Sequence, residues 1–239
     1  MLEQKITLTD VVKDDYYYDE AIKTLRTNLQ FSGKNNKAIL ITSTVPGEGK
    51  SDICFHLAAE LGKAGKKVLL IDADIRKSVY MTRFQIEEQV NGLSQFLSGQ
   101  IEKLDQFLYK TNFENLHIIL AGPVAPNPSE MLGDSTFGDL IRATRKVYDY
   151  VLIDTPPVNS VIDAAVVGQH CDGALLVVES GGISYRDVLK AKNQLEKSGC
   201  RVLGAVLNKV DIHVGRYYHS YYKEGKYYYG SNSSDQEDS

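Results

Sequence analysis

The sequence predicts an α/β fold with a doubly wound, mostly parallel sheet. Short apolar runs recur along the 239 residues, and amphipathic stretches of helical length separate them. The runs are continuously apolar rather than alternating, which is typical of strands buried on both faces of a parallel sheet. Because strands and helices alternate, the crossovers are expected to be right-handed and ligands to bind beyond the carboxyl ends of the strands.

Strand and helix follow each other in order through the middle of the chain. Ahead of the first strand, Asp19–Phe31 carries Ile22, Leu25 and Leu29 at helical spacing, which predicts an amphipathic helix. Further helices are predicted near residues 51–64, 134–147, 160–169 and 184–198. The predicted strands are Ala38–Ile41, Val68–Ile71, Leu116–Leu120, Val151–Ile153, Ala174–Val178 and Val202–Leu207.

The chain after Asp211 differs from the rest. It has no aliphatic residue beyond Val214 and ends in a polar, acidic run, so it cannot bury enough apolar surface to become ordered. We therefore predict three parts. They are an N-terminal helical segment over residues 1–35, a central α/β domain over residues 36–211 and a disordered tyrosine-rich tail over residues 212–239.

Composition and charge narrow the function classes. The chain is 43% hydrophobic and 24% charged, which is ordinary for a globular protein. Its formal charge of −4 gives no broad basic field, so nucleic acid is not an expected partner. Cys54, Cys171 and Cys200 lack metal-ligand spacing and are expected to be reduced thiols. Because we find neither a secretory signal nor an apolar run long enough to cross a bilayer, we expect a cytoplasmic protein without a membrane span.

A glycine-rich loop follows the first predicted strand. The segment Thr42–Ser51 reads T-S-T-V-P-G-E-G-K-S and leads into a predicted helix, where backbone N–H groups at the helix N-terminus would face a phosphate. Gly47 and Gly49 would let the backbone approach the phosphate oxygens. Lys50 would neutralise those oxygens, and the Ser51 hydroxyl would ligate Mg²⁺. The strict pattern has a further glycine early in the loop, where this chain has threonine.

Two other predicted strands end in carboxylates. Val151–Asp154 ends in Asp154, and a buried anion there needs a partner such as a metal ion. Val68–Arg76 contains Asp72 and Asp74, which point the same way because side chains alternate along a strand. Two carboxylates aimed at one site repel unless a cation lies between them, and Mg²⁺ is the simplest such cation. As an alternative to metal binding, Asp154 would be a capping or turn residue before the prolines. Asp72 and Asp74 would alternatively form a solvated Asp-x-Asp turn.

Together, the motifs P-G-E-G-K-S, L-L-I-D-A-D-x-R and V-L-I-D-T-P-P resemble the bacterial tyrosine kinases. These are P-loop proteins related to the septum-positioning and chromosome-partition ATPases. The resemblance runs from Glu20 to the terminal tyrosines. It is nearest to the cytoplasmic, separately encoded kinases of Gram-positive capsule and exopolysaccharide operons, and it implies that residues 36–211 form a kinase domain that uses ATP and Mg²⁺.

The resemblance also implies a role for each loop and strand-end residue. Lys50 and Ser51 become Walker A residues, and Asp154 becomes the Walker B residue. Asp72 and Asp74 become Walker A′ carboxylates, and Asp72 is expected to help deprotonate a tyrosine hydroxyl, whose unperturbed pKa is about 10. The expected catalytic group is Lys50, Asp72, Asp74 and Asp154. The expected Mg²⁺ ligands are Ser51, Asp72, Asp74 and Asp154. The residues expected to bind ATP are Pro46, Gly47, Glu48, Gly49, Lys50, Ser51, Asp52 and Asn208.

Several of these assignments leave alternatives open. Asn208 closes the last strand, where relatives place the nucleotide base, but it is equally suited to capping. On the N-terminal helix, Glu20, Lys23 and Arg26 stand where the family has Glu-x-x-Arg-x-x-Arg and uses it to assemble a ring of subunits. Lys23 replaces the first arginine and gives up bidentate pairing. The three charges would pair across a subunit interface or with each other.

Asp52 departs from the family pattern. The family has threonine after G-K-S, with its hydroxyl and N–H facing the α-phosphate. A carboxylate in the first turn favours the empty helix because it complements the helix dipole, but it repels a triphosphate. The side chain would either weaken ATP binding in this way or rotate outward and leave only its N–H in use.

A tyrosine cluster marks the tail. Seven of the 15 tyrosines lie between residues 217 and 229, with Arg216, Lys223 and Lys226 interleaved. One alternative is a sticky aromatic segment that binds a partner or nucleic-acid bases. Beside a kinase site, the tail is instead expected to be the substrate of autophosphorylation. The expected phosphorylation sites are Tyr217, Tyr218, Tyr221, Tyr222, Tyr227, Tyr228 and Tyr229.

The resulting hypothesis is an ATP-dependent protein tyrosine kinase that phosphorylates its own tail and regulates capsular or exopolysaccharide synthesis. The resemblance implies a homo-oligomeric ring, a cognate tyrosine phosphatase, and a membrane polysaccharide co-polymerase that activates the kinase and recruits it to the inner face of the membrane. One alternative is a partition-type switch ATPase, although Val45 and Pro46 stand where such ATPases have an extra lysine. Another is a nucleotide-gated scaffold without productive phosphotransfer, which Asp52 would favour.

Overall fold

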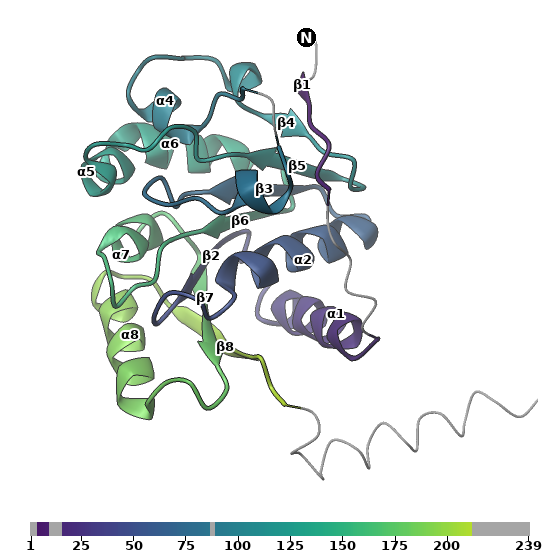
Figure 1. The fold of residues 1–239 in the computed structure, drawn as a ribbon, viewed down its shortest axis with the longest axis vertical. Coiled ribbons are helices and arrows are strands. Elements are labelled where there is room, and N and C mark those ends of the chain that lie inside the picture. Colours follow the sequence, from purple (N-terminus) through teal and green to yellow (C-terminus); the bar gives the residue numbers. More distant parts are fainter. Residues whose placement is uncertain (1–3, 10–15, 87–88, 212–239) are drawn as a thin grey trace, which may run out of the picture. The chain divides into compact units, whose positions relative to one another are not determined.

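The computed structural model describes residues 4–9, 16–86 and 89–211. Within these ranges the chain forms one eight-stranded sheet in the order β1-β4-β5-β3-β6-β2-β7-β8, and every pair is parallel except β4 with β5. The prediction of a mostly parallel α/β sheet is confirmed (Figure 1). The strands are β1 Gln4–Lys5, β2 Ala38–Ser43, β3 Val68–Asp72, β4 Tyr109–Lys110, β5 Leu116–Ile119, β6 Tyr150–Asp154, β7 Gly173–Glu179 and β8 Val202–Asn208.

Helices cover both faces of this sheet. All six strands and all five helical regions predicted from the sequence are present, and the short elements β1, β4, α3, α4 and α5 are additional. The helices are α1 Tyr16–Phe31, α2 Lys50–Lys63, α3 Tyr80–Arg83, α4 Leu93–Leu97, α5 Pro128–Gly133, α6 Ser135–Thr144, α7 Asp163–Gly168 and α8 Tyr185–Lys197, with a 3₁₀ turn at Leu104–Gln106.

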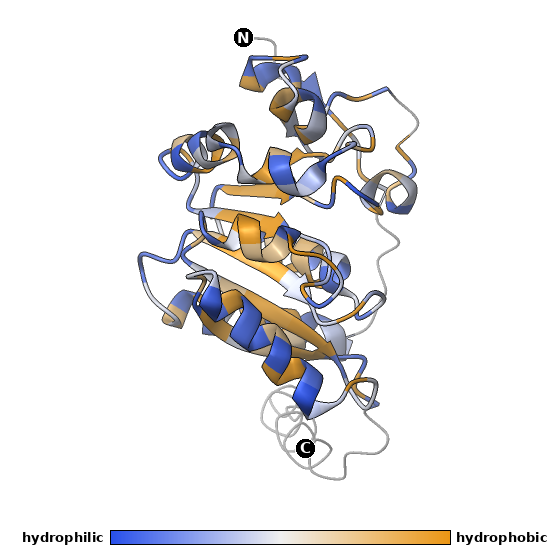
Figure 2. Ribbon diagram, turned by 90° about the vertical axis from the view of Figure 1, so that its left-hand side faces the viewer, coloured by the Kyte–Doolittle hydropathy of each residue, from blue (hydrophilic) through white to orange (hydrophobic). Residues whose placement is uncertain are grey.

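The central strands are buried on both faces, as their continuous apolar runs predict. In β2, Leu40 packs into the layer formed with α5 to α8, whereas Ile39 and Ile41 pack into the layer formed with α1 and α2. The alternation of side chains along a strand places neighbours in opposite layers. Figure 2 shows the strands as the most hydrophobic elements between flanking helices of mixed character.

Strand register brings the predicted acidic residues together. Asp72 of β3 is the register partner of Asp154 of β6, and Asp154 is also the partner of Ile41 in β2. The loop that follows β2 therefore starts beside both carboxylates, at the carboxyl edge of the sheet, where ligands of such sheets bind.

The helix α1 belongs to the compact unit Met1–Asn208, together with the sheet. None of the helices in the described ranges has the length and apolar character needed to cross a bilayer. The tail tyrosines lie outside the described residues, so the boundary of the tail and its disorder remain predictions.

Candidate active site

The loop between β2 and α2 has the backbone of a phosphate cradle. Gly47 and Gly49 have φ angles of 88° and 89°, in the left-handed region that favours glycine. A Cβ atom on Gly49 would lie 2.2 Å from Nδ2 of Asn208, whereas one on Gly47 would meet nothing within 4 Å. The loop is therefore closed on the side of Gly49 and open at Gly47. The open side leaves room for a ligand beside the first turn of α2.

A buried carboxylate holds this loop from the inside. Glu48 is 1% exposed, and its Oε2 accepts hydrogen bonds from the N–H and hydroxyl of Thr44, both at 2.6 Å, and from the N–H of Val45 at 2.9 Å. Its Oε1 accepts from the N–H of Glu179 at 3.0 Å. Thr44, which replaces a glycine of the strict pattern, therefore supplies a hydroxyl that Glu48 needs.

The side chain of Asn208 also supports the loop. Its Nδ2 donates to the carbonyl of Glu48 at 2.9 Å. Glu48 and Asn208 are both predicted to bind ATP, and in the structure their side chains fix the backbone that would contact phosphate. Contact between Asn208 and adenine stays a prediction.

Lys50 lies at the centre of a buried acidic cluster. Its Nζ is 3.5 Å from Oδ1 of Asp154, 3.6 Å from Oδ2 of Asp74 and 3.0 Å from Oγ of Ser51. Asp154 is 1% exposed, and neither of its carboxylate oxygens has a hydrogen-bond partner. An ionised buried carboxylate without hydrogen bonds is costly, so this arrangement favours the arrival of a cation.

The pKa values in the cluster reflect its crowded negative charge. Burial raises the pKa of Asp72 to about 8, and the charge of Asp154 adds to this rise, while a hydrogen bond of 2.5 Å from the Ser78 hydroxyl opposes it. Burial also raises the pKa of Asp154, although Lys50 opposes it. Burial lowers the pKa of Lys50, but the carboxylates of Asp154, Asp74 and Asp72 outweigh that effect and raise it. One ammonium group therefore faces an excess of carboxylates.

The oxygen donors of this cluster suit Mg²⁺, a hard cation that binds through one or two carboxylates together with substrate phosphates. In the described ranges, no group of three or more acidic, histidine or cysteine side chains is arranged to hold a metal ion by itself. A cation bound beside Asp154 would therefore need oxygens from a phosphate ligand, which the open loop can receive.

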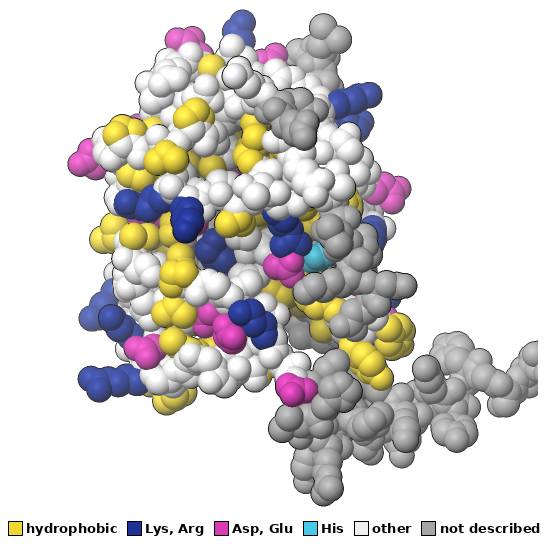
Figure 3. All heavy atoms as spheres, viewed as in Figure 1, with side chains coloured by type: hydrophobic (Ala, Val, Ile, Leu, Met, Phe, Trp, Pro, Cys, Tyr) yellow, Lys and Arg dark blue, Asp and Glu magenta, His cyan; other side chains and the backbone are white. Residues whose placement is uncertain are grey.

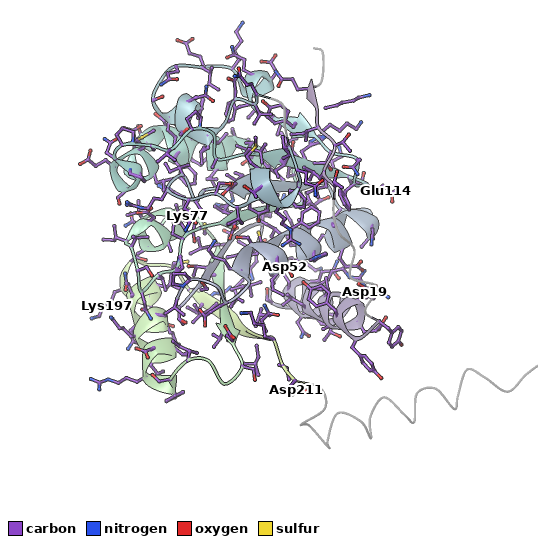
Figure 4. The ribbon with its side chains drawn as sticks, in the orientation of Figure 1. Asp19, Asp52, Lys77, Glu114, Lys197 and Asp211 are labelled. Atoms are coloured by element: carbon purple, nitrogen blue, oxygen red, sulfur yellow. The ribbon has the colours of Figure 1, made fainter. Side chains whose placement is uncertain are left out.

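The side chain of Asp52 is bound away from this cluster. Its Oδ2 accepts a hydrogen bond from the Tyr18 hydroxyl at 2.6 Å, and its Oδ1 lies 2.5 Å from NH1 of Arg83 and 3.7 Å from Nε2 of His56. Burial acts to raise the pKa of Asp52, but Tyr18 and Arg83 lower it overall. The structure thus has the outward orientation, one of the two alternatives left open by the sequence. Figure 4 labels Asp52 near the start of α2, and Figure 3 shows acidic, basic and histidine side chains gathered over that region.

The charged residues of α1 pair within the chain. Glu20 and Lys23 form an ion pair of 2.7 Å with each other, and NH1 of Arg26 lies 2.7 Å from Oε1 of Glu60 in α2. The structure therefore shows the pairing within one subunit, and assembly into a ring stays a prediction.

One buried ion pair beside the site escapes sequence reasoning. Asp163, at the start of α7, is fully buried and accepts hydrogen bonds from Nε and NH2 of Arg76 at 2.6 and 2.9 Å, and from the Ser129 hydroxyl at 2.7 Å. Arg76 is visible in the motif L-L-I-D-A-D-x-R, but nothing in the sequence indicates its partner 87 residues away. Tyr80, buried and donating to the carbonyl of Ser51 at 3.1 Å, is missed in the same way.

Comparison with known proteins agrees with this geometry. A family model described as an AAA domain matches residues 36–197. The tyrosine-protein kinase CpsD of Streptococcus pneumoniae serotype 4 is 44% identical over 207 residues, which cover 87% of this chain and 89% of that protein.

Solved structures give the same result. The kinase domain of the Escherichia coli tyrosine kinase ETK matches with a TM-score of 0.78 and 34% identity, over 82% of this chain and 77% of that one. The septum site-determining protein MinD of Pyrococcus horikoshii, complexed with Mg-ADP, matches with a TM-score of 0.61 and 28% identity, over 72% and 69%. The chain belongs to the bacterial tyrosine-protein kinases, which share their P-loop fold with MinD-type ATPases.

Proposed function

We propose that this chain transfers the γ-phosphoryl group of ATP to tyrosines of its own tail, and that this reaction regulates capsular or exopolysaccharide synthesis. The observation that carries the proposal is the position of Lys50, which directly follows the open phosphate loop. Its Nζ lies 3.5 Å from Oδ1 of Asp154, a buried carboxylate whose oxygens lack hydrogen-bond partners. If the ion pair of Lys50 and Asp154 served only to stabilise the fold, the carboxylate of Asp154 would be expected to have hydrogen-bond partners, and the loop would not need to be open.

The proposed roles follow from these positions. The N–H groups of residues 47–51 bind the phosphates at the N-terminus of α2, and Lys50 neutralises the β and γ oxygens. The proposed oxygen donors for Mg²⁺ are Asp154, Asp74, Asp72 and the Ser51 hydroxyl, of which one or two carboxylates would hold the ion together with a phosphate. The ion would neutralise charge that develops on the phosphates.

In the proposed reaction, the tyrosine oxygen forms a bond to the γ-phosphorus while the bond from that phosphorus to the leaving oxygen of ADP breaks. The tyrosine proton is lost in the same step, and Asp72 is the proposed acceptor. In the chain alone, burial and the charge of Asp154 raise the pKa of Asp72 to about 8. A cation bound beside Asp72 would favour the ionised carboxylate, which is the form that can accept the proton. The protein otherwise positions the reactants and neutralises charge.

The tail is the proposed acceptor because of its composition. Seven tyrosines lie within residues 217–229, and an extended chain from Asp211 to Tyr229 spans roughly 60 Å, enough to enter its own site or that of a neighbour. Each phosphate adds about −1.5 to −2 charges, so a phosphorylated tail repels others of its kind. We propose that phosphorylation disassembles a ring built through α1, that a tyrosine phosphatase reverses it, and that a membrane polysaccharide co-polymerase recruits and activates the kinase.

The test is a variant in which all seven tail tyrosines are replaced by phenylalanine. We expect it to bind ATP–Mg²⁺ as wild type does and to lose most of the phosphotyrosine formed during incubation with ATP, measured by blotting and peptide mass spectrometry. Abundant phosphotyrosine elsewhere in that variant would show that the tail is not the main substrate.

The likeness to MinD favours a second candidate, a switch ATPase. It would release phosphate without forming phosphotyrosine, so both products are measured in the same incubation. The scaffold alternative loses its main support, because the carboxylate of Asp52 is paired with Tyr18 and Arg83.

A further inference from the structure

Asp52 occupies a position where a carboxylate can compete with a phosphate. The helix α2 starts after Gly49, so Lys50 and Ser51 are its first two residues and Asp52 its third. A carboxylate at the third position commonly reaches back to unpaired N–H groups of the first turn. These are the same groups that bind an anionic ligand, and the helix dipole favours either anion there.

Two donors from other elements hold the carboxylate in a different orientation. The Tyr18 hydroxyl, from α1, donates to Oδ2 at 2.6 Å, and NH1 of Arg83, from α3, lies 2.5 Å from Oδ1. His56, one turn further along α2, lies 3.7 Å from Oδ1. Both carboxylate oxygens of Asp52 are therefore engaged by side chains of other residues.

Packing keeps both donors in place. The guanidinium of Arg83 lies over the rings of Phe55 and Phe84, at 5.8 and 5.5 Å from their centroids. The ring of Tyr18 contacts His56 edge-on, at 5.2 Å between centroids. Neighbouring side chains therefore position both donors, so holding Asp52 requires little further ordering of side chains.

We propose that Tyr18 and Arg83 are positioning residues for the nucleotide site, and that they keep the Asp52 carboxylate away from the phosphate-binding turn of α2. They act through Asp52 and need not touch the nucleotide. This inference rests on the proposed function, because it requires a phosphate ligand at that turn. It also explains how this chain keeps a phosphate site although its loop is followed by an acidic residue.

The inference makes nucleotide affinity depend on Arg83 and Tyr18 only while residue 52 is acidic. We expect Arg83→Gln to weaken ATP–Mg²⁺ binding about tenfold and Tyr18→Phe about threefold, because the freed carboxylate repels the phosphates and competes for the N–H groups. We expect Asp52→Thr alone to bind within about threefold of wild type, because in the wild type the carboxylate is already held away. In the Asp52→Thr background, adding Arg83→Gln or Tyr18→Phe should leave the affinity unchanged.

The experiment is a double-mutant cycle in the full chain, with ATP–Mg²⁺ and ADP–Mg²⁺ affinities measured by titration calorimetry and folding checked by thermal unfolding. Arg83→Lys keeps the charge and should restore most of the affinity lost in Arg83→Gln. Arg142→Gln, which removes an arginine paired with Asp139 on α6, is the matched control and should have no effect. If Arg83→Gln does not fold, Tyr18→Phe carries the test, because it removes only a hydroxyl and keeps the ring.

Losses of affinity that disappear in the Asp52→Thr background support the inference. Equal losses in the wild-type and Asp52→Thr backgrounds, or no loss with Tyr18→Phe in the wild-type background, overturn it. A wild-type chain that binds neither nucleotide would instead overturn the proposed nucleotide site itself, so the two failures are distinguishable.

Discussion

Asp154 and Asp163 are both buried aspartates, and their surroundings differ sharply. Asp163 is fully buried and accepts three hydrogen bonds, two from Arg76 and one from Ser129. Asp154 is 1% exposed, has no hydrogen-bond partner on either oxygen, and has the ammonium of Lys50 3.5 Å away.

The difference indicates that Asp163 is a structural carboxylate, whereas Asp154 is suited to binding a ligand. Taking a carboxylate out of water costs several kcal/mol, and only close hydrogen-bonded partners offset it. For Asp163 those partners belong to the folded chain. For Asp154 the remaining partner is proposed to arrive with the nucleotide, so this residue would contribute to activity rather than to stability.

The largest expected effect comes from removing the charge of Asp154. We expect Asp154→Asn to lower the rate of phosphotyrosine formation by about 10²–10³-fold, because the charge arrangement around the phosphates is lost. The temperature of unfolding without nucleotide should stay the same or rise, since a buried charge without hydrogen bonds is removed. A parallel fall of activity and unfolding temperature would contradict the separation of the two aspartates.

Asp163→Asn should give the opposite result. It breaks the bidentate pair with Arg76, and we expect a loss of about 3 kcal/mol in the free energy of unfolding, measured by urea denaturation. The folded protein should still bind ATP–Mg²⁺ with nearly the affinity of wild type. A stable Asp163→Asn variant that fails to bind nucleotide would place Asp163 in the nucleotide site. It would contradict the distinction between a structural Asp163 and a ligand-binding Asp154.

The sequence predicts one of these aspartates and not the other, for a physical reason. Asp72 and Asp154 end apolar strands, and strand register then brings them together, so a local pattern suffices. The pair of Arg76 and Asp163 joins residues 87 apart, and the bond from Tyr18 to Asp52 joins residues 34 apart. No periodicity relates such partners, so only the packing of α1, α3 and α7 determines them.

The same limit applies to the fold. The long buried strands and amphipathic helices are predictable because their periodicity extends over several residues. The strands β1 and β4 contain two residues each, too few for any periodicity, and they exist through pairing with their neighbours. The inward orientation of Glu48 is equally invisible in the loop sequence, where an acidic residue is expected to face solvent.

Glu48 offers a third buried carboxylate that sharpens the comparison, because it is satisfied yet lies in the phosphate loop. In Glu48→Gln, an amide NH₂ would replace one carboxylate oxygen. It would then face a backbone N–H that donates to that oxygen in the wild type. We expect a smaller loss, about 1–2 kcal/mol in the free energy of unfolding, together with a several-fold loss of ATP affinity. Measuring both in one variant checks this, and a change in stability without any change in affinity would show that the loop does not depend on Glu48 to bind nucleotide.

The most direct test of the central claim is to count and locate phosphates on the chain after incubation with ATP–Mg²⁺ and the cytoplasmic segment of the proposed partner, a polysaccharide co-polymerase. Intact-mass and peptide mass spectrometry would be applied to wild type and to Lys50→Met, with ADP measured in the same samples. We predict several phosphates on Tyr217–Tyr229 in wild type and none in Lys50→Met. Formation of ADP without phosphotyrosine in wild type, or equal phosphotyrosine in both proteins, would contradict the assignment of this site as a tyrosine kinase.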